Sequence, residues 1–290
     1  MKLLLSSFCL AVSLNAAAEA PAPKAKKPAE LPGTDMELKT QDGWTLKAKF
    51  KSAQPGQKTF VLLHGKGQRK EFMLRLANRL SMAGYGYLGV DLRGHGQSNI
   101  GPDGEPITYK KFKTTKAQND FANMAMDVQA AVSALVAQYV PEESIGIIGT
   151  DVGGSVGLKY AAVHPQAPLL VMLSPGMEYQ EVTTVNAMRA YKDRPILMIY
   201  GELDKKSSRE TPILYEFAKR SVGERKATMI AVPHKQGVRL LNGQVIQLVL
   251  NWIINPVKTD TVGPSSSTVL APGVPDAQSA DSSSELILDP

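Results

Sequence analysis

The sequence is short of the residues that build disulfide frameworks and metal sites. Its 290 residues contain one cysteine, Cys9, and four histidines. A single cysteine cannot form an intramolecular disulfide or a cysteine-rich zinc or iron–sulfur site. The histidines lie far apart, and no two have the four-residue spacing of a pair of metal ligands on one helix. We therefore expect no metal and no cofactor.

Long hydrophobic runs and aromatic residues are also scarce. No segment reaches about 18 uninterrupted apolar residues, the length that a membrane-spanning helix needs. Aromatic residues make up 6% of the chain, and they do not alternate with basic residues as on nucleic-acid-binding surfaces. We expect neither a transmembrane segment nor a nucleic-acid partner. The formal charge of +6 is compatible with a weak attraction to an anionic surface.

The N-terminus has the pattern of a secretory signal peptide. In residues 1–20, Lys2 gives a positively charged start, residues 3–14 form an apolar stretch, and an alanine-rich segment follows. Cys9 follows Phe8, which is not the small residue that a lipoprotein signal requires, so we expect no lipid anchor. The pattern predicts a cleaved leader and a secreted or periplasmic protein.

Composition divides the rest of the chain into three parts. Residues 21–33 form a Pro/Ala/Lys linker, and residues 256–290 form a tail rich in Ser, Pro, Asp and Gly without an aromatic residue. Such compositions cannot bury enough apolar surface to fold. We expect one folded domain at residues 34–255, which is long enough for a sizeable core.

Within that domain, short β-branched runs alternate with longer amphipathic ones. The sequence predicts strands at residues 37–40, 45–51, 59–63, 87–91, 144–149, 169–173, 196–200 and 227–232. It predicts helices at residues 71–83, 119–139, 154–163, 212–222 and 244–254. Asp42-Gly43 is a hairpin signal between the first two strands. The alternation predicts an α/β protein with a doubly wound, mostly parallel sheet after an antiparallel N-terminal hairpin.

Ligands of a doubly wound sheet bind beyond the carboxyl ends of its strands. Five such ends carry glycine and polar residues: LLHGKG at 62–67, VDLRGHGQS at 90–98, IGTDVGG at 148–154, YGELD at 200–204 and VPH at 232–234. In this order and at these intervals they resemble the α/β-hydrolase superfamily, in particular its capless monoacylglycerol lipase and serine aminopeptidase-like branch. The resemblance covers residues 34–255 and implies the α/β-hydrolase fold with no large cap domain.

The resemblance also implies a catalytic triad. The family's nucleophile is the third residue of a G-x-S-x-G turn between a strand and a helix. Here that turn reads GTDVG at residues 149–153, so Asp151 takes the nucleophile's place. Asp204, after the strand at 196–200, matches the family's acid, and His234, after the last strand, matches its base.

The same resemblance places the oxyanion hole on the backbone. Its two donors are the N–H groups of Val152, which follows the nucleophile position, and of Lys66, in the turn after the strand at 59–63. The glycines that flank Lys66 let the backbone approach a ligand closely.

A second G-x-S-x-G pattern occurs at residues 153–157, with Ser155 at its centre. The elbow must begin where the strand at 144–149 stops, and Ser155 comes about one helical turn after Asp151. We interpret Ser155 as a residue of the following helix. A shifted elbow with Ser155 as the nucleophile remains an alternative.

An aspartate at the elbow changes the chemistry. A carboxylate with the ordinary aspartate pKa of about 3.9 is ionised at neutral pH and needs no base. Its attack on an ester carbonyl would give a high-energy anhydride. Attack on an alkyl carbon gives an ordinary ester, which water activated by His234 could hydrolyse. Asp151 in this place resembles the nucleophile of haloalkane dehalogenases, fluoroacetate dehalogenases and epoxide hydrolases.

Those enzymes carry a cap that stabilises the leaving group, and this chain has little room for one. Residues 174–194 have a length typical of a loop and a helix. Tyr179 and Tyr191 lie in that segment, where we expect surface or packing roles. The lysine-rich loop at residues 100–118 is expected to cover part of the site and to favour an anionic substrate.

Two hypotheses about function follow. The first is a hydrolase that acts on a small-molecule substrate, either ester-like or alkyl, through Asp151. The alternative is a catalytically inactive binding or envelope-associated protein that has lost the nucleophilic serine. An inactive protein has no catalytic reason to keep Asp204 and His234, so the sequence favours the enzyme.

Overall fold

The computed structural model describes residues 29–115, 117–233 and 237–258. The predicted signal peptide, most of the predicted linker, the tail beyond residue 258 and His234 lie outside the described residues. The described residues up to Val257 belong to one compact unit.

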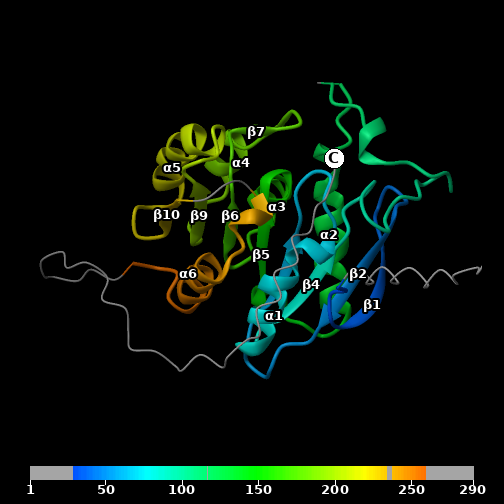
Figure 1. The fold of residues 1–290 in the computed structure, drawn as a ribbon, viewed down its shortest axis with the longest axis horizontal. Coiled ribbons are helices and arrows are strands. Elements are labelled where there is room, and N and C mark those ends of the chain that lie inside the picture. Colours follow the sequence, from blue (N-terminus) through cyan, green and yellow to red (C-terminus); the bar gives the residue numbers. More distant parts are fainter. Residues whose placement is uncertain (1–28, 116, 234–236, 259–290) are drawn as a thin grey trace, which may run out of the picture. The chain divides into compact units, whose positions relative to one another are not determined.

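In the described part of the chain, eight strands form one sheet in the order β1-β2-β4-β3-β5-β6-β9-β10 (Figure 1). The strands are β1 (Thr34–Lys39), β2 (Thr45–Lys51), β3 (Thr59–Leu63), β4 (Gly86–Val90), β5 (Ile145–Thr150), β6 (Leu170–Leu173), β9 (Ile196–Gly201) and β10 (Ala227–Val232). The pairs β1–β2 and β2–β4 are antiparallel, and all other neighbours are parallel. The predicted hairpin and parallel sheet are confirmed.

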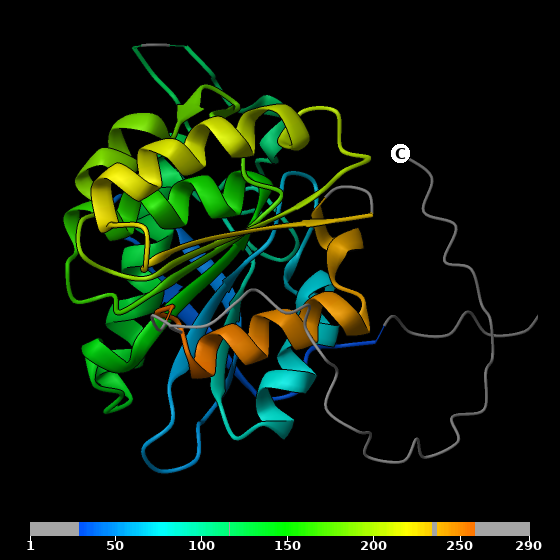
Figure 2. The same ribbon diagram turned by 90° about the vertical axis from the view of Figure 1, so that its left-hand side faces the viewer.

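Helices cover both faces of the sheet (Figure 2). One layer contains α1 (Leu74–Met82) and α6 (Gly243–Ile254). The other contains α2 (Ala125–Ala137), α3 (Asp151–Val163), α4 (Val185–Ala190) and α5 (Ser207–Val222). Every residue of β3, β4, β5 and β6 is buried, as expected for strands covered on both sides. The core therefore consists of two hydrophobic clusters, one on each face.

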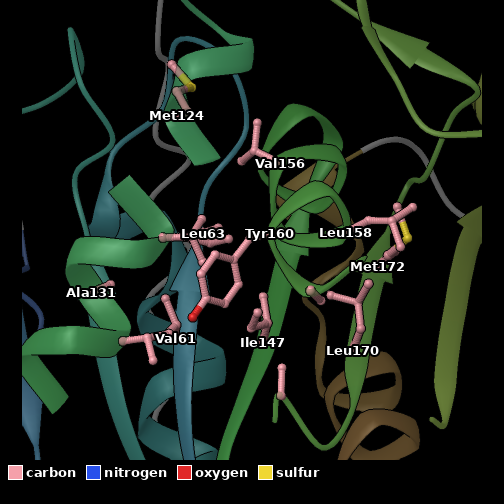
Figure 3. Packing of buried hydrophobic residues seen from close by; sticks show 14 of the residues in the cluster. Val61, Leu63, Met124, Ala131, Ile147, Val156, Leu158, Tyr160, Leu170 and Met172 are labelled. Atoms are coloured by element: carbon pink, nitrogen blue, oxygen red, sulfur yellow. The ribbon is translucent and has the colours of Figure 1, made fainter. Parts of the chain in front are cut away.

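The larger cluster lies between the sheet and the helix layer that contains α3. Figure 3 shows side chains of α3, including Tyr160, facing residues of β3 and β5 such as Val61 and Ile147. A Cβ atom on Gly157 would lie 2.9 Å from Cγ2 of Ile147, so glycine permits the close approach of α3 to β5. This packing fixes the helix that begins at the predicted nucleophile position.

The segment at residues 174–194 contains more structure than the sequence predicted. A small hairpin of β7 (Glu178–Tyr179) and β8 (Val182–Thr183) precedes α4. Its turn residues Gln180 and Glu181 have φ values of 54° and 59°. Such turns normally use Asn and Gly, so no turn signal was present in the sequence. The segment is still too short for a cap domain.

The folded unit also begins earlier than residue 34. Leu31, within the predicted linker, is 1% exposed and belongs to the cluster on the α1 and α6 face. The Tyr87 hydroxyl donates a hydrogen bond to the Pro32 carbonyl. The linker prediction is corrected here: an isolated leucine in a Pro/Ala/Lys segment can still fill a place in the core. No helix among the described residues is long and apolar enough to cross a membrane.

Candidate active site

Asp151 occupies the sharp turn where β5 ends and α3 begins. Its φ of 47° lies in the left-handed region, which is uncommon for a non-glycine residue and strained. The glycines on either side make the turn feasible. A Cβ atom on Gly149 would lie 2.5 Å from the Gly154 nitrogen, and one on Gly153 would lie 2.7 Å from the Leu63 carbonyl oxygen. The strand, strained turn and helix predicted around Asp151 are thus present.

The Asp151 carboxylate lies between two other loops. A Cβ atom on Gly65, in the turn after β3, would overlap its Oδ2 atom. A Cβ atom on Gly237, at the start of the short helix Gly237–Leu240, would lie 2.7 Å from the same atom. The carboxylate is therefore enclosed by backbone on two sides, and the side chain is 8% exposed.

The two predicted oxyanion donors belong to the elements beside this carboxylate. Lys66 follows Gly65 directly in the chain. Val152 is in the first turn of α3, where N–H groups have no acceptor within the helix and favour an anion. The backbone around Asp151 is therefore suited to receiving negative charge on oxygen.

Ser155 lies in α3, as predicted. It is fully buried, and its hydroxyl donates to the Asp151 carbonyl oxygen at 3.3 Å. This is the hydrogen bond that a serine inside a helix makes to the residue four positions earlier. The Ser155 hydroxyl is therefore engaged in a hydrogen bond within α3. The residue with the strained backbone conformation of the elbow is Asp151.

Asp204 follows β9 and is 6% exposed. Its Oδ1 accepts hydrogen bonds from the backbone N–H groups of Lys206 (3.1 Å) and Ser207 (3.2 Å), at the start of α5. These bonds satisfy N–H groups that the helix itself leaves free. Its Oδ2 is buried and has no hydrogen-bond partner among the described residues. One oxygen thus fixes the turn, and the other remains available to a donor such as His234, which lies outside the described residues.

The β7–β8 hairpin forms one wall near these carboxylates. The Tyr179 hydroxyl donates to the Ser174 carbonyl oxygen at 3.0 Å. Burial raises the pKa of Tyr179, and the negative charges of Asp151 and Asp204 raise it further. Tyr179 therefore stays protonated near both carboxylates. Tyr191 has the predicted packing role, because it is fully buried and its hydroxyl donates to the Pro195 carbonyl.

The tip of this hairpin connects two other loops, a role that the sequence did not indicate. Gln180 accepts a hydrogen bond on Oε1 from the Lys66 Nζ at 3.0 Å. Its carbonyl oxygen accepts one from the Asn119 side chain at 2.9 Å. The hairpin is therefore tied to the turn that carries the predicted oxyanion donor.

His64 is hydrogen-bonded to the turn at Gly65, and the His95 ring lies beside that of His64, with centroids 5.1 Å apart. His64 donates from Nδ1 to the Gly65 carbonyl (2.8 Å) and accepts on Nε2 from the Leu92 N–H (3.1 Å), which fixes it as neutral. Burial lowers the pKa of His95 to about 3, with a smaller contribution from His64. The His95 ring stacks on Tyr109, with centroids 4.5 Å apart. Both histidines therefore have architectural roles.

No group of three or more His, Cys, Asp or Glu side chains that could hold a metal ion occurs in the described ranges. Gly65, after β3, and Gly237, after β10, lie against Asp151 at the carboxyl ends of the parallel strands. This arrangement can present a carboxylate, and oxyanion donors beside it, to a small molecule.

Comparisons with known proteins show which families this chain is similar to. The family model described as "Serine aminopeptidase, S33" matches residues 54–193. The AB hydrolase superfamily protein YisY of Bacillus subtilis (strain 168) is 29% identical over 116 residues, which cover 39% of this chain. The match spans about a third of that protein (36%).

Solved structures share the fold. The Pyrococcus furiosus esterase Pf2001 superposes with a TM-score of 0.61 at 20% identity, covering 79% of this chain and 94% of that one. The α/β hydrolase GrgF from Penicillium sp. sh18 gives a TM-score of 0.62 at 18% identity, covering 77% and 97%. At these identities the likeness establishes the fold.

Proposed function

Because the chain belongs to the α/β-hydrolase superfamily, we propose that it is a hydrolase of small ester-like or alkyl substrates that uses Asp151 as its nucleophile. The observation that carries the proposal is the position of Asp151 itself: it has the strained φ of 47° at the β5–α3 turn, with its carboxylate against Gly65. Asp204 and His234 complete the triad. The family match supports a hydrolase over the inactive binding protein.

In the first step, an Asp151 carboxylate oxygen attacks an sp³ carbon of the substrate. The bond from that carbon to the leaving group breaks, and the leaving group takes the electron pair. An alkyl ester of Asp151 results. No base is needed, because the carboxylate is the ionised form of aspartate at neutral pH.

In the second step, water attacks the carboxyl carbon of this ester while His234 accepts the proton of the water. The negative charge of Asp204 stabilises the resulting imidazolium. The ester carbonyl oxygen becomes an oxyanion that the N–H groups of Val152 and Lys66 stabilise. The bond to the alcohol oxygen then breaks, His234 returns its proton to the alcohol, and the carboxyl group releases the second proton of the water to solvent, which regenerates the carboxylate.

We also propose that the leader at residues 1–20 is removed and that the protein acts as a secreted or periplasmic enzyme. The signal-peptide pattern supports this location. A net positive charge would favour weak contact with an anionic envelope surface.

The mechanism is tested by a single turnover in H₂¹⁸O with a panel of small epoxides and alkyl bromides. The attacking water gives its oxygen to the carboxylate, so the peptide that contains Asp151 should gain one ¹⁸O atom, whereas the first alcohol product should not. Asp151→Ala is the control and should neither form product nor take up label. Label that enters the first product and never the Asp151 peptide would contradict the proposal.

A further inference from the structure

Ser174 has a strained backbone at the end of β6. Its φ is 50°, although it is not glycine, and it precedes Pro175, a position that normally favours extended backbone. Ser174 is also fully buried. Strain of this kind persists where the surroundings determine the conformation, and it is frequent at functional sites.

Three hydrogen bonds determine the conformation of Ser174. Its N–H donates to the Ile199 carbonyl at 2.8 Å, and its own carbonyl accepts from the Tyr179 hydroxyl at 3.0 Å. Its Oγ accepts from the Gly237 N–H at 2.6 Å. The hydroxyl thus holds the backbone of a residue that is 63 positions further along the chain.

Gly237 packs close to the Asp151 carboxylate. Its φ is 63°, and a Cβ atom on it would lie 2.7 Å from Oδ2 of Asp151. A Cβ atom on Gly65 would overlap the same oxygen. The Ser174 hydroxyl therefore sets the position of one of the backbone segments that, among the described residues, lie against the carboxylate.

The next residue links Ser174 to the Asp204 turn. The Pro175 carbonyl accepts hydrogen bonds from the Ser207 hydroxyl at 2.6 Å and from the Thr211 hydroxyl at 3.1 Å. Both belong to α5, whose first N–H groups are held by Asp204. The Ser174-Pro175 pair thus joins the loops of Asp151 and Asp204.

We infer that Ser174 is a positioning residue: its hydroxyl fixes Gly237 against the Asp151 carboxylate and so holds the carboxylate in the geometry for attack. Ser174 acts through Gly237 and does not touch the substrate. The inference rests on the proposed role of Asp151 as nucleophile. A displacement of about 1 Å at a reacting group can slow a reaction by about 10²-fold, so the position of Gly237 matters.

Amide hydrogen exchange tests the link without any enzymatic activity. In Ser174→Ala, the Gly237 N–H loses its acceptor and should exchange at least about 10-fold faster than in the wild type. Ser98→Ala is the matched control, because Ser98 is equally buried and its hydroxyl accepts from the Lys47 N–H at 2.8 Å. In Ser98→Ala, the Lys47 amide should exchange faster than in the wild type, and the exchange of the Gly237 amide should not change. Unchanged Gly237 exchange in Ser174→Ala would overturn the inference.

The rate of Asp151 alkylation separates positioning from stability. In a His234→Gln background, where the ester persists, and with 1,2-epoxyhexane as the probe, Ser174→Ala and Ser174→Gly should both form the Asp151 adduct about 10- to 100-fold more slowly than His234→Gln alone. Glycine relieves the backbone strain, so Ser174→Gly should be the more stable of the two. If Ser174→Gly recovers the rate of adduct formation as well as the stability that Ser174→Ala loses, the role of Ser174 is merely structural. If His234→Gln alone forms no adduct, the proposed function fails and the positioning role falls with it, whatever the exchange result.

Discussion

A carboxylate at the β5–α3 turn lies where the superfamily's serine hydroxyl is expected. The turn itself has the geometry of a nucleophile elbow, with a positive φ at Asp151 and glycines where backbone passes closely. The difference between this chain and a serine hydrolase is therefore concentrated in one side chain. The Asp151 carboxylate also lies against Gly65, in the space where we propose that the oxyanion of an ester substrate forms.

Asp151→Ser should consequently create an esterase. Serine is smaller and uncharged, so it supplies a hydroxyl nucleophile and vacates the space for the oxyanion. We expect p-nitrophenyl acetate hydrolysis at least about 10²-fold above the wild type, the magnitude that base catalysis contributes. Release of p-nitrophenol measures it, and Asp151→Ser/His234→Ala should lose the gain. An inert but folded Asp151→Ser would favour the inactive binding protein.

A fluorophosphonate probe distinguishes the two candidate nucleophiles. Such probes react with a serine hydroxyl activated by histidine. The wild type should remain unlabelled, because the Ser155 hydroxyl is buried in α3 and bonded to the Asp151 carbonyl. Asp151→Ser should become labelled at residue 151. Labelling of the wild type that disappears in Ser155→Ala would contradict the assignment of Asp151 to the elbow.

At the scale of elements, the elbow depends on how closely α3 approaches β3. A Cβ atom on Gly153 would lie 2.7 Å from the Leu63 carbonyl oxygen. Because this oxygen belongs to the backbone of β3, relieving the overlap would require the strand or α3 to move. A Cβ atom on Gly154, the next residue, would lie 3.1 Å from its nearest neighbour, the Gly149 carbonyl oxygen. The two glycines lie in the same turn of α3 but have different surroundings.

Gly153→Ala should therefore lower the free energy of unfolding by about 3 kcal/mol or more through overpacking. Gly154→Ala should change it by less than about 1 kcal/mol, because the higher helix propensity of alanine offsets the tight contact. Urea unfolding of both variants checks the difference. Equal losses in the two variants would show that α3 does not approach β3 as described.

Most elements could be predicted from the sequence because buried parallel strands are short apolar runs and the helices between them are amphipathic. β10, for example, has the predicted bounds at residues 227–232. The β7–β8 hairpin could not be predicted, since its strands have two residues each and its turn uses Gln180 and Glu181. Leu31 was missed because a single apolar residue has no periodicity.

The positions of Asp151 and Asp204 could be predicted because each follows a recognisable strand. The contacts of Ser174 and Gly237 could not be, because they join segments 63 residues apart through one hydroxyl. Such contacts depend on how the loops meet above the sheet and leave no local pattern. The sequence thus indicates which residues are at the edge of the sheet, whereas the folded structure shows which of them touch.

At the scale of the whole molecule, buried His95 makes stability depend on pH. Its folded-state pKa of about 3 lies below the ordinary value of about 6.5 expected in the unfolded chain. The unfolded chain therefore takes up a proton that the folded protein does not as the pH falls below about 6.5. This contribution to stability is complete above that pH and is lost progressively toward pH 3.

His95→Gln should flatten that dependence. Below about pH 6, the wild-type free energy of unfolding should fall more steeply than that of the variant, by up to about 1.4 kcal/mol per pH unit for one proton. Urea unfolding midpoints between about pH 7 and pH 4.5 measure both slopes. The comparison of slopes is independent of any loss of stability at neutral pH. Parallel curves would show that His95 becomes protonated in the folded protein.

The most direct measurement of the central claim is mass spectrometry of the protein after reaction with small epoxides and alkyl bromides in His234→Gln. Without its base, the ester formed in the first step should persist. The account predicts one covalent adduct, located on the peptide that contains Asp151, and none in Asp151→Ala/His234→Gln. An adduct on Ser155, or no adduct in a folded protein across the panel, would contradict Asp151 as the nucleophile.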